Sequence, residues 1–258
     1  VAFYHGRTST DWKVRLYHFF ERWAVGAASA IAPVAEGVED HFRRRDRIRL
    51  MPIPNGLVPI AGTDRNRAEV RKELGIRDGV PLLGFVGRFS REKAPDRFVE
   101  IFAELAGSHP SLHGIMLGDG ALFADVQESI VDLGLAHRIR LPGRVSDVGN
   151  YYAAMDALLI PSRSEVFPNV LLEAVSAGIP VAAAPVGGIP SIADRVGTVF
   201  LAKSTDALSL AEAAARALRF RDPDQLERGR QRLEQDYSQR RRAELAAELY
   251  RSVLEGSL

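Results

Sequence analysis

From residue 82 onward, short continuous apolar runs alternate with segments in which apolar residues recur at helical spacing. The runs, which predict buried strands, lie at residues 82–86, 114–117, 139–141, 157–160 and 180–183. Between them, segments such as the one with Phe98, Phe102 and Leu105 on one face predict amphipathic helices, and another helix is predicted at 169–177. This alternation is typical of an α/β fold with a parallel sheet covered on both faces. Ligands of such sheets bind beyond the carboxyl ends of the strands.

The first 60 residues show the same alternation over a shorter span. Apolar runs at residues 2–4 and 29–34 predict strands, whereas helical spacing from Trp12 to Ala28 and the charged stretch 36–45 predict helices. Two prolines and an Asn-Gly pair then break regular structure in the stretch Met51–Gly56. We therefore expect a domain boundary at this stretch.

The composition is that of an ordinary globular protein and excludes several classes. The chain has 258 residues, 46% of them hydrophobic, which is enough to bury one large core or two smaller ones. Without cysteine, it can hold neither disulfides nor a cysteine-based zinc site. A net charge of +1, from 34 basic and 33 acidic residues, argues against a nucleic-acid partner. Since its apolar stretches fall short of the ~20 residues that span a bilayer, we expect a cytoplasmic protein.

The first candidate site lies in the loop after the strand predicted at 82–86. Gly87 ends that strand and lets the backbone approach a ligand closely. Arg88 and Lys93 follow in the same loop and provide two cations. A diphosphate bound in the crevice would need such charge, both to bind and to be stabilised as a leaving group. A loop that carries surface charges fits this segment equally well.

Two glycine pairs follow later strands. Gly118 and Gly120 flank Asp119 in a turn that permits close backbone approach to a base or a ribose. Gly187 and Gly188 follow another predicted strand and permit the same approach. Each pair is compatible with an ordinary turn, so neither identifies a ligand by itself.

A stronger signal is a pair of glutamates around the start of the helix predicted at 169–177. Glu165 lies in the loop before that helix, and Asn169 is predicted to be the N-cap. Glu173 lies about one turn inside the helix, where a carboxylate can accept hydrogen bonds from a vicinal diol such as ribose. Because amides at a helix N-terminus attract anions, acids on both sides of it suit a nucleotide-sugar better than a bare phosphate. For Glu173, a carboxylate that complements the helix dipole is the alternative.

Taken in order, these segments resemble the donor-binding domain of the family 4 retaining glycosyltransferases, which have the GT-B fold. The resemblance covers residues 82–201 and rests on Gly87-Arg88…Lys93, Gly118-Asp-Gly120, Leu141-Pro-Gly-Arg144, Tyr151-Tyr-Ala-Ala-Met-Asp156, Pro161-Ser162, Glu165 through Glu173, and Gly187-Gly188. The two glutamates reproduce the E-x7-E signature of that family. Two positions depart from its pattern, since Ala94 replaces the usual glycine after the lysine and Ser191 replaces a common glutamate.

The resemblance implies a role for each matching residue. Arg88 and Lys93 are expected to bind the donor diphosphate, and Glu165 the hydroxyls of the donor sugar. Glu173 is expected to bind the ribose hydroxyls, and the backbone around Arg144 is expected to contact the base. The implied donor-binding set comprises Gly87, Arg88, Lys93, Gly118, Asp119, Gly120, Arg144, Glu165, Phe167, Asn169, Val170 and Glu173.

The opening of the chain resembles the back portion of the acceptor-side domain of the same family. There His5 matches a histidine that reaches the cleft near the reacting sugar. With Arg88, Lys93 and Glu165 it makes up the catalytic set that the resemblance implies, and a structural histidine is the alternative.

The implied architecture is GT-B, with two Rossmann-like parallel-sheet domains of which the first is incomplete. Residues 1–56 are expected to be the back portion of the acceptor-side domain. Residues 57–236 are expected to form the donor-binding domain, and residues 237–258 a helix that returns toward the first domain.

The implied activity is transfer of a sugar from a UDP- or GDP-linked donor to a glycan or lipid-linked acceptor, with retention at the anomeric carbon. The candidate site contains no evident covalent nucleophile, which agrees with the family's usual account of front-face attack. In that account the departing diphosphate helps to take the acceptor proton. We identify no metal motif in the candidate site and expect metal-independent transfer without a cofactor.

Other interpretations stay open at this point. A nucleotide-sugar epimerase of similar architecture would bind the same ligand, although the glutamate pair and the Gly-Arg…Lys loop argue against it. A non-catalytic module that binds a nucleotide-sugar is the second alternative. The predicted helix from Trp12 to Ala28 carries basic residues that suit peripheral contact with the inner face of a membrane, but an ordinary packing helix is favoured. The oligomeric state is left open.

Overall fold

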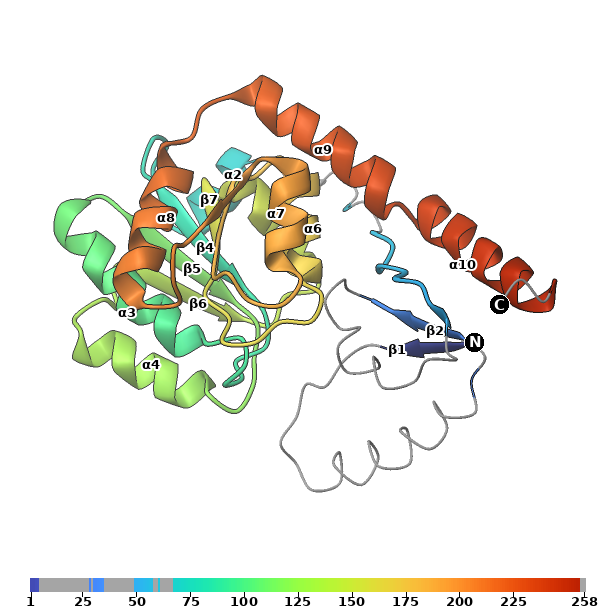
Figure 1. Ribbon diagram of the computed structural model, residues 1–258. Coiled ribbons are helices and arrows are strands. Elements are labelled where there is room, and N and C mark those ends of the chain that lie inside the picture. The colour runs from blue at the N-terminus through green and yellow to red at the C-terminus, as the bar shows by residue number, and fades with distance from the viewer. Residues whose placement is uncertain (5–27, 29, 35–48, 58–59, 61–66, 256–258) are drawn as a thin grey trace. The chain divides into compact units, whose positions relative to one another are not determined.

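The computed structural model describes residues 1–4, 28, 30–34, 49–57, 60 and 67–255 (Figure 1). By its internal contacts the chain divides into two compact units, Val1–Val58 with Gln235–Leu258, and Pro59–Glu234. The sequence prediction places the corresponding boundaries after residues 56 and 236. His5 and the helices predicted to begin at Trp12 and at residue 36 lie outside the described residues.

The second unit is built on a parallel sheet with the strand order β6-β5-β4-β7-β8-β9. Its strands are β4 (Leu82–Val86), β5 (His113–Leu117), β6 (Ile139–Gly143), β7 (Ala157–Ile160), β8 (Val181–Ala183) and β9 (Val199–Leu201). The strands predicted at 82–86 and 157–160 are confirmed at both ends, and the other three predicted strands differ by one or two residues at one end. Residues of the central strands are almost all buried, which explains continuous apolar runs in place of alternation.

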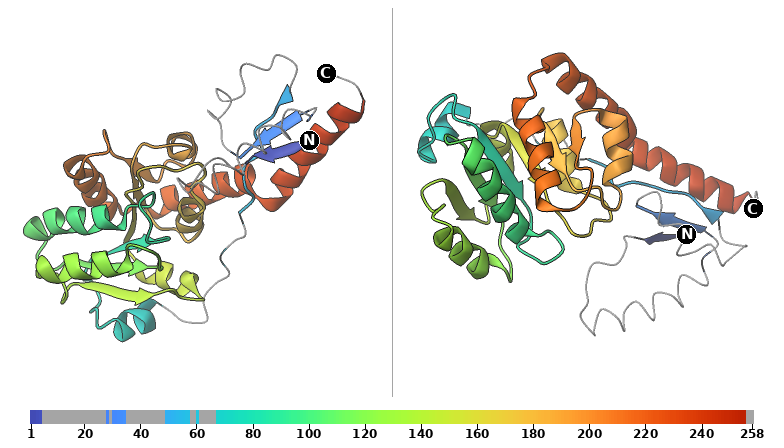
Figure 2. Two further views of the ribbon diagram at one scale, coloured as in Figure 1. Left: turned by 90° about the horizontal axis from the view of Figure 1, so that it is seen from below. Right: turned by 60° about the vertical axis from the view of Figure 1, so that its left-hand side comes forward.

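Helices lie on both faces of this sheet, as Figures 1 and 2 show. The helices of this unit are α2 (Arg67–Glu73), α3 (Pro95–Ser108), α4 (Phe123–Asp132), α5 (Val148–Ala154), α6 (Asn169–Ser176), α7 (Ile189–Val196) and α8 (Ala207–Arg219). The next helix, α9 (Pro223–Tyr237), continues past Glu234, where this unit ends. The predicted apolar face of α3 is confirmed, because Phe98, Phe102 and Leu105 are buried in one core with Leu83 and Phe85 of β4. The α/β prediction for this part of the chain is therefore correct.

The order of the strands reverses between β4 and β7. From β4 the chain moves outward through β5 to β6, and from β7 it moves in the opposite direction through β8 to β9. β4 and β7 are direct neighbours, with Leu83 opposite Ala157. A reversal of this kind leaves a crevice beyond the carboxyl ends of the strands at the reversal. The loops after β4 and β7, at 87–94 and 161–168, carry five of the predicted site residues, Gly87, Arg88, Lys93, Glu165 and Phe167.

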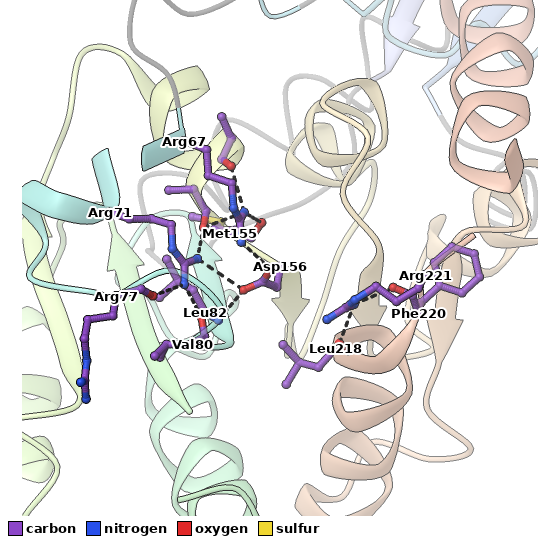
Figure 3. Close-up of polar contacts among 12 residues, drawn as sticks. Arg67, Arg71, Arg77, Val80, Leu82, Met155, Asp156, Leu218, Phe220 and Arg221 are labelled. Atoms are coloured by element: carbon purple, nitrogen blue, oxygen red, sulfur yellow. Dashed lines mark hydrogen bonds and ion pairs between the residues drawn. The ribbon is translucent and has the colours of Figure 1, made fainter. Parts of the chain in front are cut away.

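An ion-pair network fastens the opposite, amino-terminal ends of β4 and β7 (Figure 3). Asp156, just before β7, accepts hydrogen bonds from Arg67 (2.6 Å), from Arg71 (3.4 Å) and from the backbone N–H of Leu82 (2.8 Å). Arg71 is 1% exposed and also donates to the carbonyl oxygen of Ala154 at 2.8 Å. Burial, followed by the charge of Arg67, lowers the pKa of Arg71, and Asp156 opposes that shift. The network ties α2 to the sheet at the end away from the crevice.

The first unit contains a parallel sheet with the strand order β1-β2-β3. Its strands are β1 (Ala2–Tyr4), β2 (Ala30–Pro33) and β3 (Arg49–Leu50), and its C-terminal segment contains α10 (Gln239–Leu254). Leu249 of α10 is buried in a small core with Ala30 and Ala32 of β2. The backbone N–H of Leu57 donates to the carbonyl oxygen of Tyr237 at 2.6 Å. The linker and the C-terminal segment are thus joined within this unit.

Candidate functional site

A cavity of about 560 Å³ opens beyond the carboxyl ends of β4, β5 and β6. Its walls are formed by Val86, Gly87, Arg88, Leu117, Gly118, Asp119, Gly120, Arg144, Val145 and Val148. Six of these residues belong to the donor-binding set predicted from the sequence. Arg88 and Arg144 outnumber the one carboxylate, that of Asp119, so the charge of the walls suits an anionic ligand. The valines and Leu117 offer an apolar surface, as small-molecule sites usually do.

The glycines of the loop after β5 are required by a neighbouring loop. Gly118 has a φ of +134°, and a Cβ atom there would overlap the carbonyl oxygen of Gly87. Gly120 has a φ of +152°, and a Cβ atom there would lie 2.7 Å from the carbonyl oxygen of Phe89. The backbone N–H of Phe89 also donates to the carbonyl oxygen of Asp119 at 2.9 Å. In this structure the close approach that these glycines permit is between the two loops that line the cavity.

Two predicted catalytic residues from different loops form an ion pair at the strand reversal. The ammonium group of Lys93, after β4, donates to the carboxylate of Glu165, after β7. The Glu165 side chain is 6% exposed and that of Lys93 is 23% exposed, so water screens this pair less than it screens a surface pair. The Arg88 side chain is 69% exposed, with its nearest carboxylate, that of Glu92, at 3.8 Å. Arg88 is therefore accessible to a ligand in the cavity that it lines.

The backbone at Glu165 is packed against the glycine turn that follows β8. Gly187 has a φ of +55°, and a Cβ atom there would overlap the carbonyl oxygen of Glu165. This close contact explains why glycine stands at 187 without recourse to a ligand. The turn after β8 therefore supports the loop that carries Glu165.

A second ion pair, which the sequence analysis did not identify, fastens the loop after β7 to the start of α3. The guanidinium of Arg163 donates to the carboxylate of Asp96 at 2.8 Å. The backbone N–H of Arg163 donates to the carbonyl oxygen of Glu92, also at 2.8 Å. The hydrogen bond from Arg163 holds the pKa of Asp96 below its usual value. Between Glu92 and Asp96, Ala94 has a φ of +55°, in the left-handed region that glycine favours. This is the position at which the family pattern has glycine.

The start of α6 differs from the prediction in one respect. Pro168 precedes the helix as its N-cap, and the side chain of the cap makes no hydrogen bond. The predicted N-cap role of Asn169 is therefore wrong, because Asn169 already has helical conformation as the first residue of α6. Its backbone N–H donates to the carbonyl oxygen of Phe167 at 3.1 Å, and Val170 follows in the first turn. The predicted contacts of these amides with a donor stay predictions.

Glu173 lies one turn into α6, as predicted, and has a buried partner. The phenol of Tyr152, on α5, donates to Oε2 of Glu173 at 2.9 Å. Tyr152 is fully buried, whereas Glu173 is partly exposed. Burial, followed by the charge of Glu173, raises the pKa of Tyr152. Tyr152 lies in the segment that carries the family resemblance, but its sequence position gave no indication of a role.

The described part of the chain shows neither a metal-ligating cluster nor a membrane-spanning helix. Among those residues, there is no group of three or more His, Asp or Glu side chains placed to hold a metal ion. The triplet Asp222-Pro-Asp224 has Asp-x-Asp spacing but lies at the start of α9, where the Asp222 side chain accepts a hydrogen bond from the backbone N–H of Gln225 at 2.9 Å. Within the same described residues, no helix has the length and apolar character needed to cross a membrane.

The model of the family described as glycosyl transferases group 1 matches residues 66–242. The chain belongs to this family. Among curated relatives, a 2-deoxystreptamine glucosyltransferase of Streptomyces kanamyceticus is 31% identical, over 91% of this chain and 63% of its own length. A D-inositol 3-phosphate glycosyltransferase of Nocardia farcinica is 34% identical, over 72% of this chain and 43% of its own length. The chain thus spans less than two thirds of the length of these two relatives.

Solved structures agree on the fold. The crystal structure of HepE from Anabaena in complex with UDP matches 99% of this chain and 71% of its own, with a TM-score of 0.80 and 19% identity. Sucrose-phosphate synthase from Thermosynechococcus elongatus matches 98% of this chain and 67% of its own, with a TM-score of 0.77 and 23% identity. The predicted GT-B fold class is confirmed by these matches.

Proposed function

We propose that the protein transfers a sugar from a UDP- or GDP-linked donor to an acceptor hydroxyl, with retention at the anomeric carbon. The observation that carries the proposal is the site at the strand reversal of a glycosyl transferases group 1 chain. There the start of the loop after β4 lines a cavity with two arginines, and the same loop carries Lys93, which forms an ion pair with Glu165. HepE of the same fold was solved with UDP, which supports a nucleotide ligand of this kind.

The order of groups in a nucleotide-sugar supports this assignment. Such a donor carries its diphosphate directly beside its sugar, so a cation for the one and a carboxylate for the other must be neighbours. Lys93 and Glu165 are in contact although 72 positions separate them in sequence. An ammonium group has three N–H donors and can keep its carboxylate partner while it binds a phosphate oxygen. In our proposal Arg88 and Lys93 hold the diphosphate, Glu165 holds sugar hydroxyls, and Glu173 holds the ribose.

The proposed reaction exchanges one bond at the anomeric carbon for another on the same face. The bond from that carbon to the β-phosphate oxygen breaks, and its electron pair leaves with the diphosphate. The acceptor oxygen forms the new bond, and its proton passes to the departing diphosphate. Arg88 and Lys93 stabilise the charge that develops there, in a transfer that needs no metal ion. The catalytic role of His5 is part of the same proposal and rests on the family resemblance alone.

The acceptor and the cellular setting belong to the same proposal. We propose a glycan or lipid-linked acceptor and a cytoplasmic site of action, with any membrane contact peripheral. The two relatives described above are named for 2-deoxystreptamine and for inositol 3-phosphate, so the family accommodates acceptors of different chemistry. A panel of nucleotide-sugar donors is therefore a more direct test of function than a panel of acceptors.

The first step of the test is calorimetry of the chain with UDP, GDP and their common hexose conjugates, which identifies the donor. In transfer assays of the protein with that donor, Arg88→Ala and Lys93→Ala are each expected to lower kcat/KM by about 100-fold or more, as loss of a group that stabilises developing charge does. Lys72→Ala, which removes an exposed lysine of α2, is the matched control. Unchanged rates for both site variants would overturn the diphosphate assignment, and loss of transfer after chelation would overturn the metal-free mechanism.

A further inference from the structure

Tyr152 combines complete burial with a hydrogen bond to a residue of the donor site. It lies on α5, on the segment between β6 and β7, and its ring has no exposed surface. Its phenol donates to Oε2 of Glu173 across the space between α5 and α6, at 2.9 Å. A buried hydroxyl is unfavourable unless it is hydrogen-bonded, so this contact accounts for the only polar atom of the Tyr152 side chain.

The partner of this phenol makes the contact strong. Glu173 is a carboxylate, and hydrogen bonds to ionised acceptors are shorter and stronger than those between neutral groups. Burial raises the pKa of Tyr152, so its phenol stays protonated and remains a donor throughout the physiological pH range. The donor is also fixed in place, because a fully buried ring cannot change its position without disturbing the core.

Glu173 itself has a flexible side chain. It is partly exposed on α6, and several rotatable bonds separate its carboxylate from the helix. A hydrogen bond to one oxygen restricts the rotation of the whole group. It leaves lone pairs on the carboxylate for further donors, because each carboxylate accepts about four hydrogen bonds.

We propose that Tyr152 is a positioning residue for nucleotide recognition: its buried phenol orients the Glu173 carboxylate toward the 2′- and 3′-hydroxyls of the donor ribose. The proposal rests on the proposed function, in which Glu173 binds the ribose. Tyr152 acts through Glu173 and does not touch the ligand. Its effect is therefore confined to ligands that carry ribose hydroxyls.

The test compares ribonucleotides with their dideoxy analogues by calorimetry on the chain. UDP and GDP are titrated alongside the 2′,3′-dideoxy form of each. Wild type is expected to bind the better ribonucleotide at least tenfold more tightly than its dideoxy form. Tyr152→Phe is expected to weaken ribonucleotide binding about tenfold and to leave dideoxy binding unchanged. Tyr151→Phe, which removes the phenol oxygen of the partly exposed neighbour on the same helix, is the matched control.

A merely structural role for Tyr152 predicts a different result, an equal loss for both ligands or none. Either would overturn the positioning role. The proposed function survives if Glu173→Gln still removes the preference for ribose, and both proposals fail if wild type binds neither nucleotide. If the Tyr152→Phe variant does not fold, the ribonucleotide affinity of the double variant Tyr152→Phe/Glu173→Gln is compared with that of Glu173→Gln. Equal affinities in that pair support action through Glu173, and a further loss overturns it.

Discussion

Gly187→Ala is the substitution that most directly tests how the loop of Glu165 is held. The alanine adds one methyl group, at a position with a φ of +55°, and this group overlaps the carbonyl oxygen of Glu165. The left-handed conformation alone costs an alanine about 1 kcal/mol relative to glycine. Relief of the overlap requires the backbone of one loop to move until the contact exceeds 3.0 Å, below which Cβ contacts essentially never occur. Shifts of this kind in packed regions cost about 1–3 kcal/mol.

We therefore expect Gly187→Ala to lower the free energy of unfolding by about 2–4 kcal/mol, the sum of the conformational and packing costs. Gly134→Ala is the matched control, because Gly134 has a φ of +67° and no atom lies within 4 Å of the place that its added methyl group would occupy. The control isolates the conformational cost of about 1 kcal/mol. Urea unfolding of both variants and of wild type gives the two differences under the same conditions.

The same shift displaces the carboxylate that we assign to the donor sugar. A displacement on the order of 1 Å in a catalytic group can lower a rate about 100-fold. Gly187→Ala is therefore expected to reduce transfer strongly at temperatures where the variant is still folded, whereas Gly134→Ala keeps wild-type transfer. If the two variants lose equal stability and equal activity, the loop is not held by this contact, and the reasoning is refuted.

Two further predictions concern ion pairs. Asp156→Ala is expected to lower the free energy of unfolding by about 3 kcal/mol, because it leaves the buried Arg71 cation without its carboxylate; a loss below about 1 kcal/mol in urea unfolding would contradict this. Arg163→Ala is expected to cost about 0.5 kcal/mol, because the side chains of Arg163 and Asp96 are 34% and 41% exposed and solvent screens the pair. Since the folded-state pKa of Asp96 is lowered, this contribution is present at neutral pH and disappears as the pH falls below about 4. A stability difference that does not shrink as the pH is lowered from about 7 through about 4 and on through the folded-state pKa of Asp96 would show that the ion pair is not its source.

Strands β4, β5, β7 and β8 of the second unit are predictable from sequence because almost all of their residues are buried, whereas β9, whose three residues are all partly exposed, was not predicted. β4 and β7 are continuous apolar runs that a glycine or a proline follows. The apolar run and the residue that breaks it therefore predict the same end for each strand. The prediction for β6 ends two residues short, because Pro142 and Gly143 indicate a turn while the backbone still pairs with β5. Local propensity and sheet pairing conflict there, and pairing decides the outcome.

Predictions from local sequence misplace or miss contacts that depend on other segments of the same chain. Asn169 has the chemistry of an N-cap, but the helix starts one residue earlier than a cap at 169 requires, after Pro168. Arg163 and Asp96 are separated by 67 positions, and each is an ordinary surface residue type in its own segment. Tyr152 and Glu173 come from different helices. A periodicity argument assigns each of these side chains to a face but cannot identify its partner.

The amino-acid sequence by itself determined the α/β class, five of the six strands of the second unit, the face of α3 that is buried and the set of residues that resemble a donor site. These depend on short-range information, since burial periodicity and turn chemistry act over a few residues. Tertiary structure decided which of these residues meet. The reversal of strand order puts the loops after β4 and β7 side by side, so Lys93 contacts Glu165. It also makes Gly187 a packing requirement and gives Glu173 a buried phenol, because both depend on elements that the fold brings together from distant parts of the chain.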